Sequence, residues 1–353
     1  MLTPGGHLVP DDSSAAFLMQ RHEQLRQATN PLPGSVAYDN FRPINVPGRF
    51  AGLTLIDFLS ARFPNTSRDE WFDLIAAGRI VPHHSDEADG GRRAAWGLRA
   101  NRVSPDQIMR EGDRFDHVTP QYVEPNVNAD IRILYEDAAI VVVNKPAPLP
   151  MHACGRFERN TLQAILDSVY APQRLRAAHR LDAATSGVVL HARSQAVARK
   201  VQPQFEQRRV EKIYVAKVAG YPAEDDFNCT DPIAAATQPG GLRNTDHNGL
   251  PAETRFRVLS RNPDGTALVE AQPMTGRTNQ IRIHLWSLGL PICGDSYYLP
   301  DRKLGSNVVP NIESEPLCLH ARSLTFEHPE TGATVTFEAP LPEWALTESE
   351  SDS

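Results

Sequence analysis

A single carboxylate inside a basic stretch is the residue of this sequence best placed to do chemistry. Asp182 follows His179 and Arg180, and it precedes a Thr-Ser-Gly turn at 185–187 and an apolar run at 188–190. Hydroxyls followed by glycine favour a tight turn, and the apolar run is typical of a buried strand. We therefore expect Asp182 on a loop held by rigid structure, where it could act as a catalytic carboxylate. The alternative is that Asp182 only turns or caps the backbone, as most loop aspartates do.

The composition is that of an ordinary globular protein. The 353 residues are 41% hydrophobic and 22% charged, which suffices for two domains and a large core. No apolar run is long enough to cross a membrane, and residues 1–10 lack the basic and apolar regions of a secretory signal. We therefore expect a cytoplasmic protein without a membrane partner. The four cysteines are far apart and lack metal-ligand spacing, so reduced thiols are expected.

The distribution of charge favours a nucleic-acid partner, although the net charge of −7 does not. Residues 174–217 contain ten Lys and Arg against three Asp and Glu. The acidic residues gather instead at 86–89, at 224–226 and at 348–352. A local basic field around Asp182 is expected of a surface that contacts phosphates. The alternative is a solvated helix face whose cations are simply exposed.

The first part of the chain predicts an extension followed by a small domain. Residues 1–48 are rich in Pro, Gly, Asn and Ser, so we expect an arm with one helix rather than a domain. Apolar residues then recur at helical spacing, and a capping box at 67–70 opens a second helix that Gly78 ends. Two helices with short strands resemble the S4-type RNA-binding module over residues 49–119. The acidic and glycine-rich segment at 83–93 departs from the S4 pattern, and a small packing domain is the alternative.

The rest of the chain predicts one larger domain. A linker at 120–130 leads into a domain at 131–345, and the acidic, Ser-rich tail at 346–353 is expected to be disordered. Alternating and apolar runs predict three hairpins, at 131–143, 252–272 and 323–337, with helical segments between them. The predicted fold class is α+β, with a mixed, largely antiparallel β-sheet, flanking helices and a central cleft. The cleft is expected where the loop of Asp182 meets the helix of Arg282.

A series of short motifs resembles the RluA-type family of pseudouridine synthases in the family's order. The resemblance covers roughly residues 131–340 and is carried by Tyr135-Glu136-Asp137, Asn144-Lys145-Pro146, His179-Arg180-Leu181-Asp182, Lys212-Ile213-Tyr214, Thr275-Gly276-Arg277, Gln280-Ile281-Arg282-Ile283-His284, Gly294-Asp295 and Leu319-His320-Ala321. One such tetrapeptide is weak evidence, whereas this many in one order is strong. The chain departs from the family at Asn279, where the family usually carries His.

The resemblance implies an RNA pseudouridine synthase, an isomerase that needs no cofactor and no metal. It implies that Asp182 acts on the ribose of a uridine, either as a nucleophile at C1′ or as a base toward C2′. It also implies that Arg282 pairs with Asp182 and orients it. Tyr214 is implied to be catalytic, stacking on the target base and acting as a base during the reaction, whereas its alternative is a core aromatic with a satisfied hydroxyl.

Four further residues are implied to form the RNA-binding part of the cleft. Arg180 is suited to fill the place of a base flipped out of structured RNA, because a guanidinium can stack and bind phosphate. His179, Arg277 and Asn279 are expected beside it. For His179 a role in supporting the loop is the alternative, and for Arg277 and Arg282 it is a solvated surface charge.

The S4 resemblance favours ribosomal RNA over transfer RNA as the partner, and we expect a monomer. Two other classes of function stay open. A non-catalytic RNA-binding protein would be expected to lack Asp182, which this chain has. An unrelated hydrolase that uses Asp182 and Arg282 on a nucleoside would release free uracil.

Overall fold

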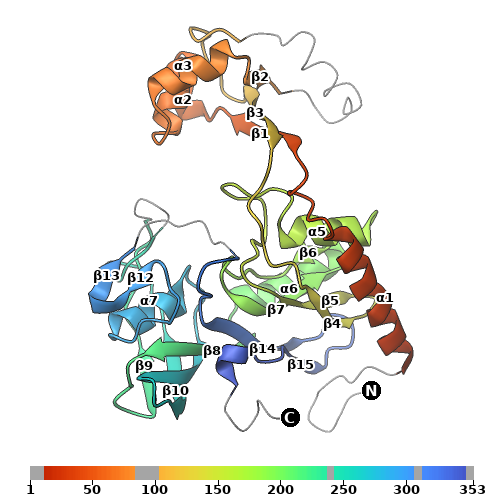
Figure 1. The fold of residues 1–353 in the computed structure, drawn as a ribbon, viewed down its shortest axis with the longest axis vertical. Coiled ribbons are helices and arrows are strands. Elements are labelled where there is room, and N and C mark those ends of the chain that lie inside the picture. The colour runs from red at the N-terminus through yellow and green to blue at the C-terminus, as the bar shows by residue number, and fades with distance from the viewer. Residues whose placement is uncertain (1–11, 84–102, 237–241, 306–311, 347–353) are drawn as a thin grey trace. The chain divides into compact units, whose positions relative to one another are not determined.

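The computed structural model describes residues 12–83, 103–236, 242–305 and 312–346. The chain forms two compact units, one of residues 36–123 and one that combines residues 1–35 with residues 124–353 (Figure 1). The small unit is therefore an insertion in the sequence of the large one.

In its described residues, the small unit is a three-stranded antiparallel sheet with two α-helices. Its strands are β1 (Tyr38–Asn45), β3 (Arg114–Tyr122) and β2 (Ile80–Pro82), and β3 lies between the other two. The helices are α2 (Leu55–Arg62) and α3 (Arg68–Ala76), and a short helical turn, η1 (Gly48–Phe50), precedes them.

Local capping explains where these two helices begin. The hydroxyl of Thr54 accepts a hydrogen bond from the backbone N–H of Asp57, which starts α2. The capping box expected at the start of α3 is confirmed, because Ser67 and Glu70 each accept the other's backbone N–H. The apolar faces of both helices then close a separate core with the sheet; its fully buried members include Leu55, Phe58, Leu59 and Ile80.

The small unit begins earlier in the sequence than the expected boundary at residue 49. Its first strand, β1, pairs with β3 along its length, so the unit starts at Val36 and ends at Val123. Most of the acidic segment expected at 83–93 lies outside the described residues. The relationship to the S4 module stays a prediction.

The large unit is built on one sheet of ten strands. The order is β4-β5-β7-β14-β8-β11-β10-β9, while β6 pairs with β7 and β15 with β14. The strands are β4 (Arg132–Glu136), β5 (Ile140–Lys145), β6 (Arg176–Ala177), β7 (Ser186–Ala192), β8 (Glu211–Ala219), β9 (Asp226–Cys229), β10 (Thr254–Arg261), β11 (Thr266–Pro273), β14 (Leu319–Glu327) and β15 (Thr334–Glu338). β7 and β14 run parallel, whereas the other pairs in this sheet are antiparallel. The predicted α+β class with a mixed, largely antiparallel sheet is confirmed.

Strand β14 joins two halves of this sheet. Strands β4, β5 and β7 lie on one side of it, and β8, β11, β10 and β9 lie on the other. The first half is covered on both faces. On one face α5 (Leu162–Tyr170) packs with Val141, Val143 and Val189. On the other face α6 (Gln195–Glu206) packs with Val142, Val188 and Leu190, whose side chains point the opposite way. An unbroken apolar run is what such a doubly covered strand requires.

The second half carries the helix expected to hold Arg282. This helix, α7 (Gln280–Ser287), places Ile281 and Leu285 against β8, β10 and β11. A two-stranded ribbon, β12 (Tyr298–Leu299) with β13 (Lys303–Leu304), lies in the segment after α7. Two short helical turns complete the described elements, η4 (Pro300–Arg302) and η5 (Glu343–Ala345).

The helix expected in the N-terminal arm packs on the large unit. This helix, α1 (Asp12–Ala28), buries Leu25 in the core around α5. Strand β4 is an edge of the sheet, and the Nε2 of His22 accepts the backbone N–H of Ile133 on that edge at 2.9 Å. The helix therefore covers a strand edge that would otherwise be open to pairing.

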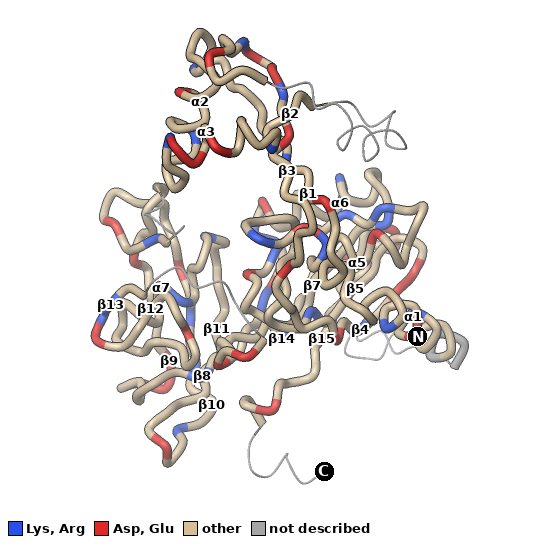
Figure 2. The backbone as a smooth tube through the Cα atoms, turned by 45° about the horizontal axis from the view of Figure 1, so that its top comes forward, with Lys and Arg blue, Asp and Glu red and all other residues tan. Residues whose placement is uncertain are grey.

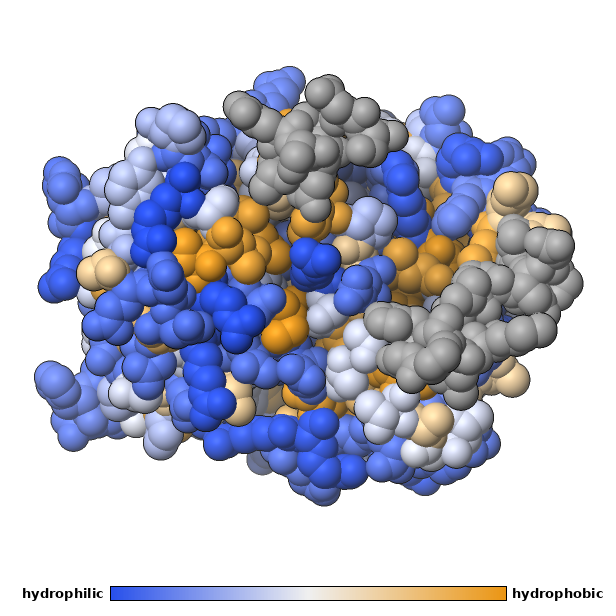
Figure 3. All heavy atoms as spheres, turned by 90° about the horizontal axis from the view of Figure 1, so that it is seen from below, coloured by the Kyte–Doolittle hydropathy of each residue, from blue (hydrophilic) through white to orange (hydrophobic). Residues whose placement is uncertain are grey.

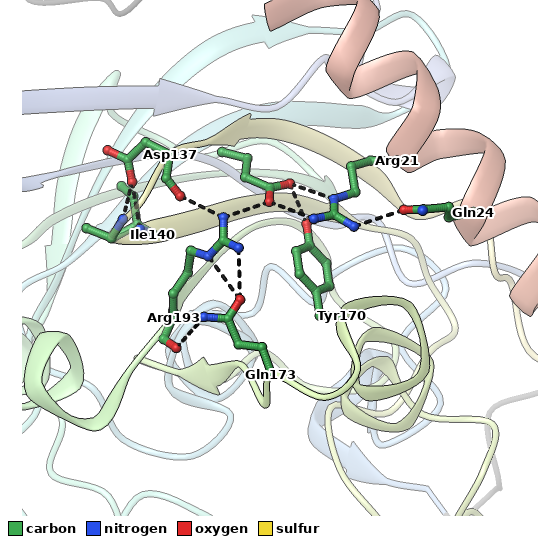
Figure 4. A network of polar contacts seen from close by, with 9 residues as sticks. Arg21, Gln24, Asp137, Ile140, Tyr170, Gln173 and Arg193 are labelled. Carbon is green, nitrogen blue, oxygen red and sulfur yellow. Dashed lines mark hydrogen bonds and ion pairs between the residues drawn. The ribbon is translucent and has the colours of Figure 1, made fainter.

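A buried carboxylate ties α1 to two other parts of the large unit. Glu136 has a side chain that is 1% exposed, and it accepts bonds from Arg21 at 3.2 Å, from Arg193 at 2.9 Å and from the hydroxyl of Tyr170 at 2.7 Å. Figure 4 shows Arg21 entering from α1 and Arg193 from the opposite side, where Gln173 also holds it. Such a pairing is what a buried charge needs to be tolerated.

Basic, acidic and uncharged residues alternate over the described part of the molecule. Acidic and basic residues are interspersed along the chain in Figure 2. On the face in Figure 3, hydrophilic side chains dominate and hydrophobic ones gather in separate patches. In the described part of the chain, no helix has the length and apolar character needed to cross a membrane.

Candidate active site

The loop before β7 is fixed by hydrogen bonds to its backbone at Asp182 and just after it. The carbonyl of Ala183 accepts the backbone N–H of Leu149 at 2.8 Å and the ammonium of Lys145 at 3.2 Å. The backbone N–H of Thr185 closes the turn on the carbonyl of Asp182 at 3.1 Å. The carboxylate is thus presented by a rigid loop, as the sequence predicted.

Glycine at 187 is required by the parallel pairing of β7 with β14. Gly187 lies opposite Ala321 and has a φ of +114°, and a Cβ there would stand 2.1 Å from the Ala321 carbonyl oxygen. The same Ala321 lies opposite Tyr214 of β8 on its other side. One row across the sheet therefore links the base of the Asp182 loop to Tyr214.

Arg282 lies in the first turn of α7, and its side chain is 6% exposed. It donates to both carboxylate oxygens of Asp295 at 2.7 Å, and its Nη1 lies 3.3 Å from the Oδ1 of Asn279 and 3.8 Å from the Oδ2 of Asp182. Asp295 is fully buried, whereas Asp182 is 31% exposed. Arg282 therefore stands between a buried carboxylate that holds it and an accessible one that it orients.

The charge of Arg282 is stabilised in this position. Burial alone lowers the pKa of Arg282, but the hydrogen bonds and charge of Asp295, with a contribution from Asp182, raise it above its ordinary value. The guanidinium also lies 5.0 Å from the ring centre of Tyr297 and 5.2 Å from that of Tyr298, within the range of cation–π attraction.

Tyr214 is a protonated phenol in this site. Burial raises its pKa above the ordinary value of 10.0, and the negative charge of Asp182 raises it further. The side chain is half-buried and lines the cleft, so it belongs to the site and not to the core alone. The hydroxyl is consequently available as a hydrogen-bond donor near neutral pH.

A cleft of about 710 Å³ in the large unit brings the predicted site residues together. This volume is in the range of binding sites for small ligands or parts of larger ones. Every residue that the sequence assigned to the site lines it: Asp182, Tyr214, Arg282, Arg180, His179, Arg277 and Asn279. Their roles in catalysis and binding stay predictions.

His179 supports the loop from within the fold. Its Nε2 accepts the backbone N–H of Leu190 at 3.1 Å, and its ring stacks on Phe205 with 4.8 Å between centres. Burial, with smaller effects of His191 and Lys212, lowers the pKa of His179 to about 3. Its ring is neutral. The observed contact is the one that supports the loop, and the position in the cleft is also compatible with contact to RNA.

Eight of the ten cations in the basic field of residues 174–217 have one or both of two settings. Four of these cations pair with carboxylates outside the cleft: Arg174, Arg193, Lys200 and Lys217. Four line the cleft, Arg180, Arg208, Arg209 and Lys212, and of these Arg209 also lies 3.9 Å from the carboxylate of Glu327. Some cations of the field are therefore structural, whereas others are placed to form a binding surface.

Sequence reasoning assigned no role to two residues that hold the site. Asp295 receives Arg282 and also accepts the backbone N–H groups of Tyr297 and Tyr298. Lys145 is fully buried, donates to three backbone carbonyls, and has its pKa lowered by burial to about 7, which the charge of Asp182 opposes. Both residues lie in the motifs that carry the resemblance, which is the signal that could have identified them.

The loop before α7 is also held by side chains. Gln280 accepts the hydroxyl of Thr275 at 2.6 Å and the backbone N–H of Arg277 at 3.0 Å, and it donates to the carbonyl of Glu253 at 2.8 Å. Asn279 itself adopts a left-handed conformation with a φ of 57°. In the described residues no group of three His, Cys, Asp or Glu side chains could hold a metal ion. The arrangement offers an accessible carboxylate, Asp182, oriented by Arg282 and close to the phenol of Tyr214.

Comparison with known proteins gives consistent matches. A family model described as RNA pseudouridylate synthase matches residues 139–287. Pseudouridylate synthase RPUSD2 of Mus musculus is 34% identical over 287 residues, which are 80% of this chain and 48% of that protein. The chain thus spans about half the length of this relative.

Two further matches cover most of the other protein. The dual-specificity RNA pseudouridine synthase RluA of Salmonella typhi is 36% identical over 211 residues, which are 59% of this chain and 92% of that protein. The solved structure of human RNA pseudouridylate synthase domain containing 1 has 27% identity and a TM-score of 0.50, and the match covers 62% of this chain and 84% of that one.

Proposed function

The chain belongs to the RNA pseudouridylate synthase family, and on that premise we propose that it converts a uridine in RNA to pseudouridine with Asp182 as the catalytic carboxylate. The single observation that carries the proposal is the position of Asp182. It is the accessible carboxylate beside Arg282, which the buried Asp295 holds in place.

The reaction is an isomerisation. The glycosidic bond between N1 of uracil and C1′ of the ribose breaks, the freed uracil turns, and a bond between C5 and C1′ forms. The proton lost from C5 is balanced by one gained at N1, so no external group donor or oxidant is needed. Asp182 acts on the ribose, either by attack on C1′ or by removal of a proton from C2′.

The neighbours of Asp182 supply the other requirements of this chemistry. Arg282 orients the carboxylate by charge, and the half-buried ring of Tyr214 offers a surface for the base. Arg180 is exposed at the cleft, where its planar guanidinium suits the place of a base flipped from the stack. Flipping costs a few kcal/mol and is easiest at unpaired sites.

Tritium release tests the catalytic assignment. Purified protein should release tritium from RNA labelled at C5 of uridine, and Asp182→Ala should abolish the release while RNA binding persists. Release of free uracil instead would support the hydrolase alternative, because isomerisation leaves the mass of the RNA unchanged. Full activity of Asp182→Ala would remove the carboxylate from the mechanism.

The RNA substrate is the finer part of the proposal. We propose ribosomal RNA, on the ground of the S4-like small unit, and transfer RNA is the alternative. The name of the Salmonella relative states dual specificity on RNA, which makes more than one kind of RNA worth testing. Mapping pseudouridines in total RNA from cells with and without the protein would identify the modified uridine and distinguish the two.

A further inference from the structure

One lysine at the cleft lacks the kind of partner that the other lysines have. The chain contains five lysines, all of them in described residues. Three pair with carboxylates and one donates to backbone carbonyls; these are Lys200, Lys217, Lys303 and Lys145. Among the residues that the structure describes, no ion pair or hydrogen bond is found for the ammonium of Lys212.

Lys212 is held in a place where an unpaired charge is costly. It lies on β8 with its side chain half-buried, and burial, together with the nearby Arg208, lowers its pKa. Its neighbour Glu211 accepts a bond from Gln272 at 3.0 Å instead. Glu206, which also lines the cleft, is exposed and makes no contact with the ammonium. A partly buried cation without a counter-ion costs free energy, and an anion that joins it reduces that cost.

The position of Lys212 relates it to the catalytic end of the cleft. Lys212 and Tyr214 are two residues apart on one strand, so their side chains point to the same face, about 7 Å apart along β8. A ligand whose base rests on Tyr214 therefore extends to Lys212 within about one nucleotide.

Gly276 leaves open space beside the Lys212 ammonium. A Cβ on Gly276 would lie 3.9 Å from the Nζ of Lys212, which is an ordinary contact, and no other heavy atom would come within 4 Å. The backbone of Gly276 does not have a positive φ. Neither packing nor backbone conformation thus requires glycine at this position, and what glycine provides is room in the cleft.

We infer that Lys212 and Gly276 form a subsite for one backbone phosphate of the RNA strand, next to the target uridine. A lysine ammonium is a point charge that suits a phosphate, and glycine lets the phosphate and its ribose approach closely. Arg180 and Arg208 line the same cleft and add to its positive field. Naming RNA as the ligand rests on the proposed function, whereas the anion site rests on the unpaired charge and the space beside it.

The salt dependence of RNA binding tests the subsite. The probe is a fluorescein-labelled decauridine, titrated with the full chain at several salt concentrations. Lys212→Met should weaken binding about tenfold, as loss of one charged hydrogen bond does, and lower the slope of log affinity against log salt by about 0.7. Lys212→Arg should keep the slope. Lys200→Met removes the same charge from a lysine paired with Glu330 and should match the wild type.

A second variant probes the space without changing charge. Gly276→Ala should keep the thermal midpoint of the wild type but weaken decauridine binding, and the loss should not add to that of Lys212→Met because both act on one contact. The subsite is wrong if folded Lys212→Met binds with unchanged affinity and slope, or if Lys200→Met changes as much. Tritium release reports the proposed function separately: its absence in the wild type refutes the isomerase, while the slope still decides the subsite.

Discussion

At the scale of the residue, the orientation of Arg282 depends on two side chains that are not expected to react. Asp295 takes two of its nitrogens, and Asn279 takes the third, which faces Asp182. Asn279 does this from a positive φ, a conformation that asparagine tolerates better than most residues. Residue 279 therefore has two requirements, a backbone with positive φ and a side chain that contacts Arg282.

Two substitutions at Asn279 separate these contributions. Asn279→Ala should lower the free energy of unfolding by about 1–2 kcal/mol. Alanine is strained at a positive φ, and it lacks the polar side chain with which asparagine offsets that strain through local hydrogen bonds. Asn279→Gly should keep the stability of the wild type, because glycine adopts a positive φ freely. Both variants should release tritium more slowly, on the order of tenfold, since they lose the acceptor that orients Arg282.

Urea unfolding and tritium release measure the two effects on the same samples. Wild-type activity in Asn279→Gly would mean that the side chain of Asn279 has no positioning role. Wild-type stability in Asn279→Ala would contradict the backbone argument.

The sequence allowed the pairing of Arg282 with Asp182 to be predicted, but only through the resemblance to a family. The bidentate partner of Arg282 was not predicted, because Asp295 lies 13 residues away in a loop without a repeating pattern. The neutral, stacked state of His179 was also beyond reach, since it depends on Phe205 from another element. Short-range spacing identifies which groups are present, whereas burial and partners are set by the fold.

At the scale of the element, the docking of α1 depends on the charge of one histidine. His22 must be neutral at Nε2 to accept the backbone N–H of Ile133 on the edge of the sheet. Burial lowers the pKa of His22 below 6.5, with Arg132 and Arg26 acting in the same direction and Asp130 against them. The unfolded chain therefore binds more protons than the folded one below pH 6.5.

The sign of this shift sets the direction of a pH dependence. The stability that His22 contributes is complete above its unfolded pKa of about 6.5 and is lost as the pH falls toward its lower folded value. At pH 5 the Ile133 amide should exchange hydrogen with solvent faster, relative to its intrinsic rate, than at pH 8. His22→Gln should remove much of this difference, because an amide oxygen can accept the same bond at either pH. An equal pH effect in both proteins would contradict the role of His22.

Elements differ in how far the sequence predicted them. The hairpins of β4 with β5, β10 with β11 and β14 with β15 follow from alternating runs separated by turn residues, and all three are confirmed. The parallel pairing of β7 with β14 was not predicted, because 134 residues separate Ser186 from His320 and no local pattern relates them. The packing of α1 on α5 and β4 also joins segments that are far apart in the sequence, so it could not be predicted from local patterns.

At the scale of the whole molecule, the small unit enters and leaves the large one at adjacent points. The backbone N–H of Glu124 donates to the carbonyl of Gly34 at 2.9 Å, so the two ends of the insertion meet within the large unit. The carboxylate of Glu124 then accepts three backbone N–H groups at 158–160. These contacts belong to the large unit alone.

Excision of the small unit should therefore leave a folded large unit. Replacing residues 36–123 with a short Gly-Ser connection should preserve cooperative unfolding and tritium release from a short single-stranded RNA. If the small unit binds RNA, affinity for ribosomal RNA should fall and its salt slope should decrease. The excised chain with Asp182→Ala is the control for activity. An excised chain that fails to unfold cooperatively would show that the large unit depends on the small one.

The central place of β14 in the sheet also has a consequence for synthesis on the ribosome. Residues near His320 are made 134 residues after their partners near Ser186, which at about 5–20 residues per second is a delay on the order of ten seconds. Until β14 is made, one edge of β7 is paired only at His191 and Ala192, by β6, and one edge of the later strand β8 has no partner; such edges attract other chains. The two halves of the sheet that carry the cleft cannot join before β14 emerges. This delay is therefore the period in which a chaperone would matter most.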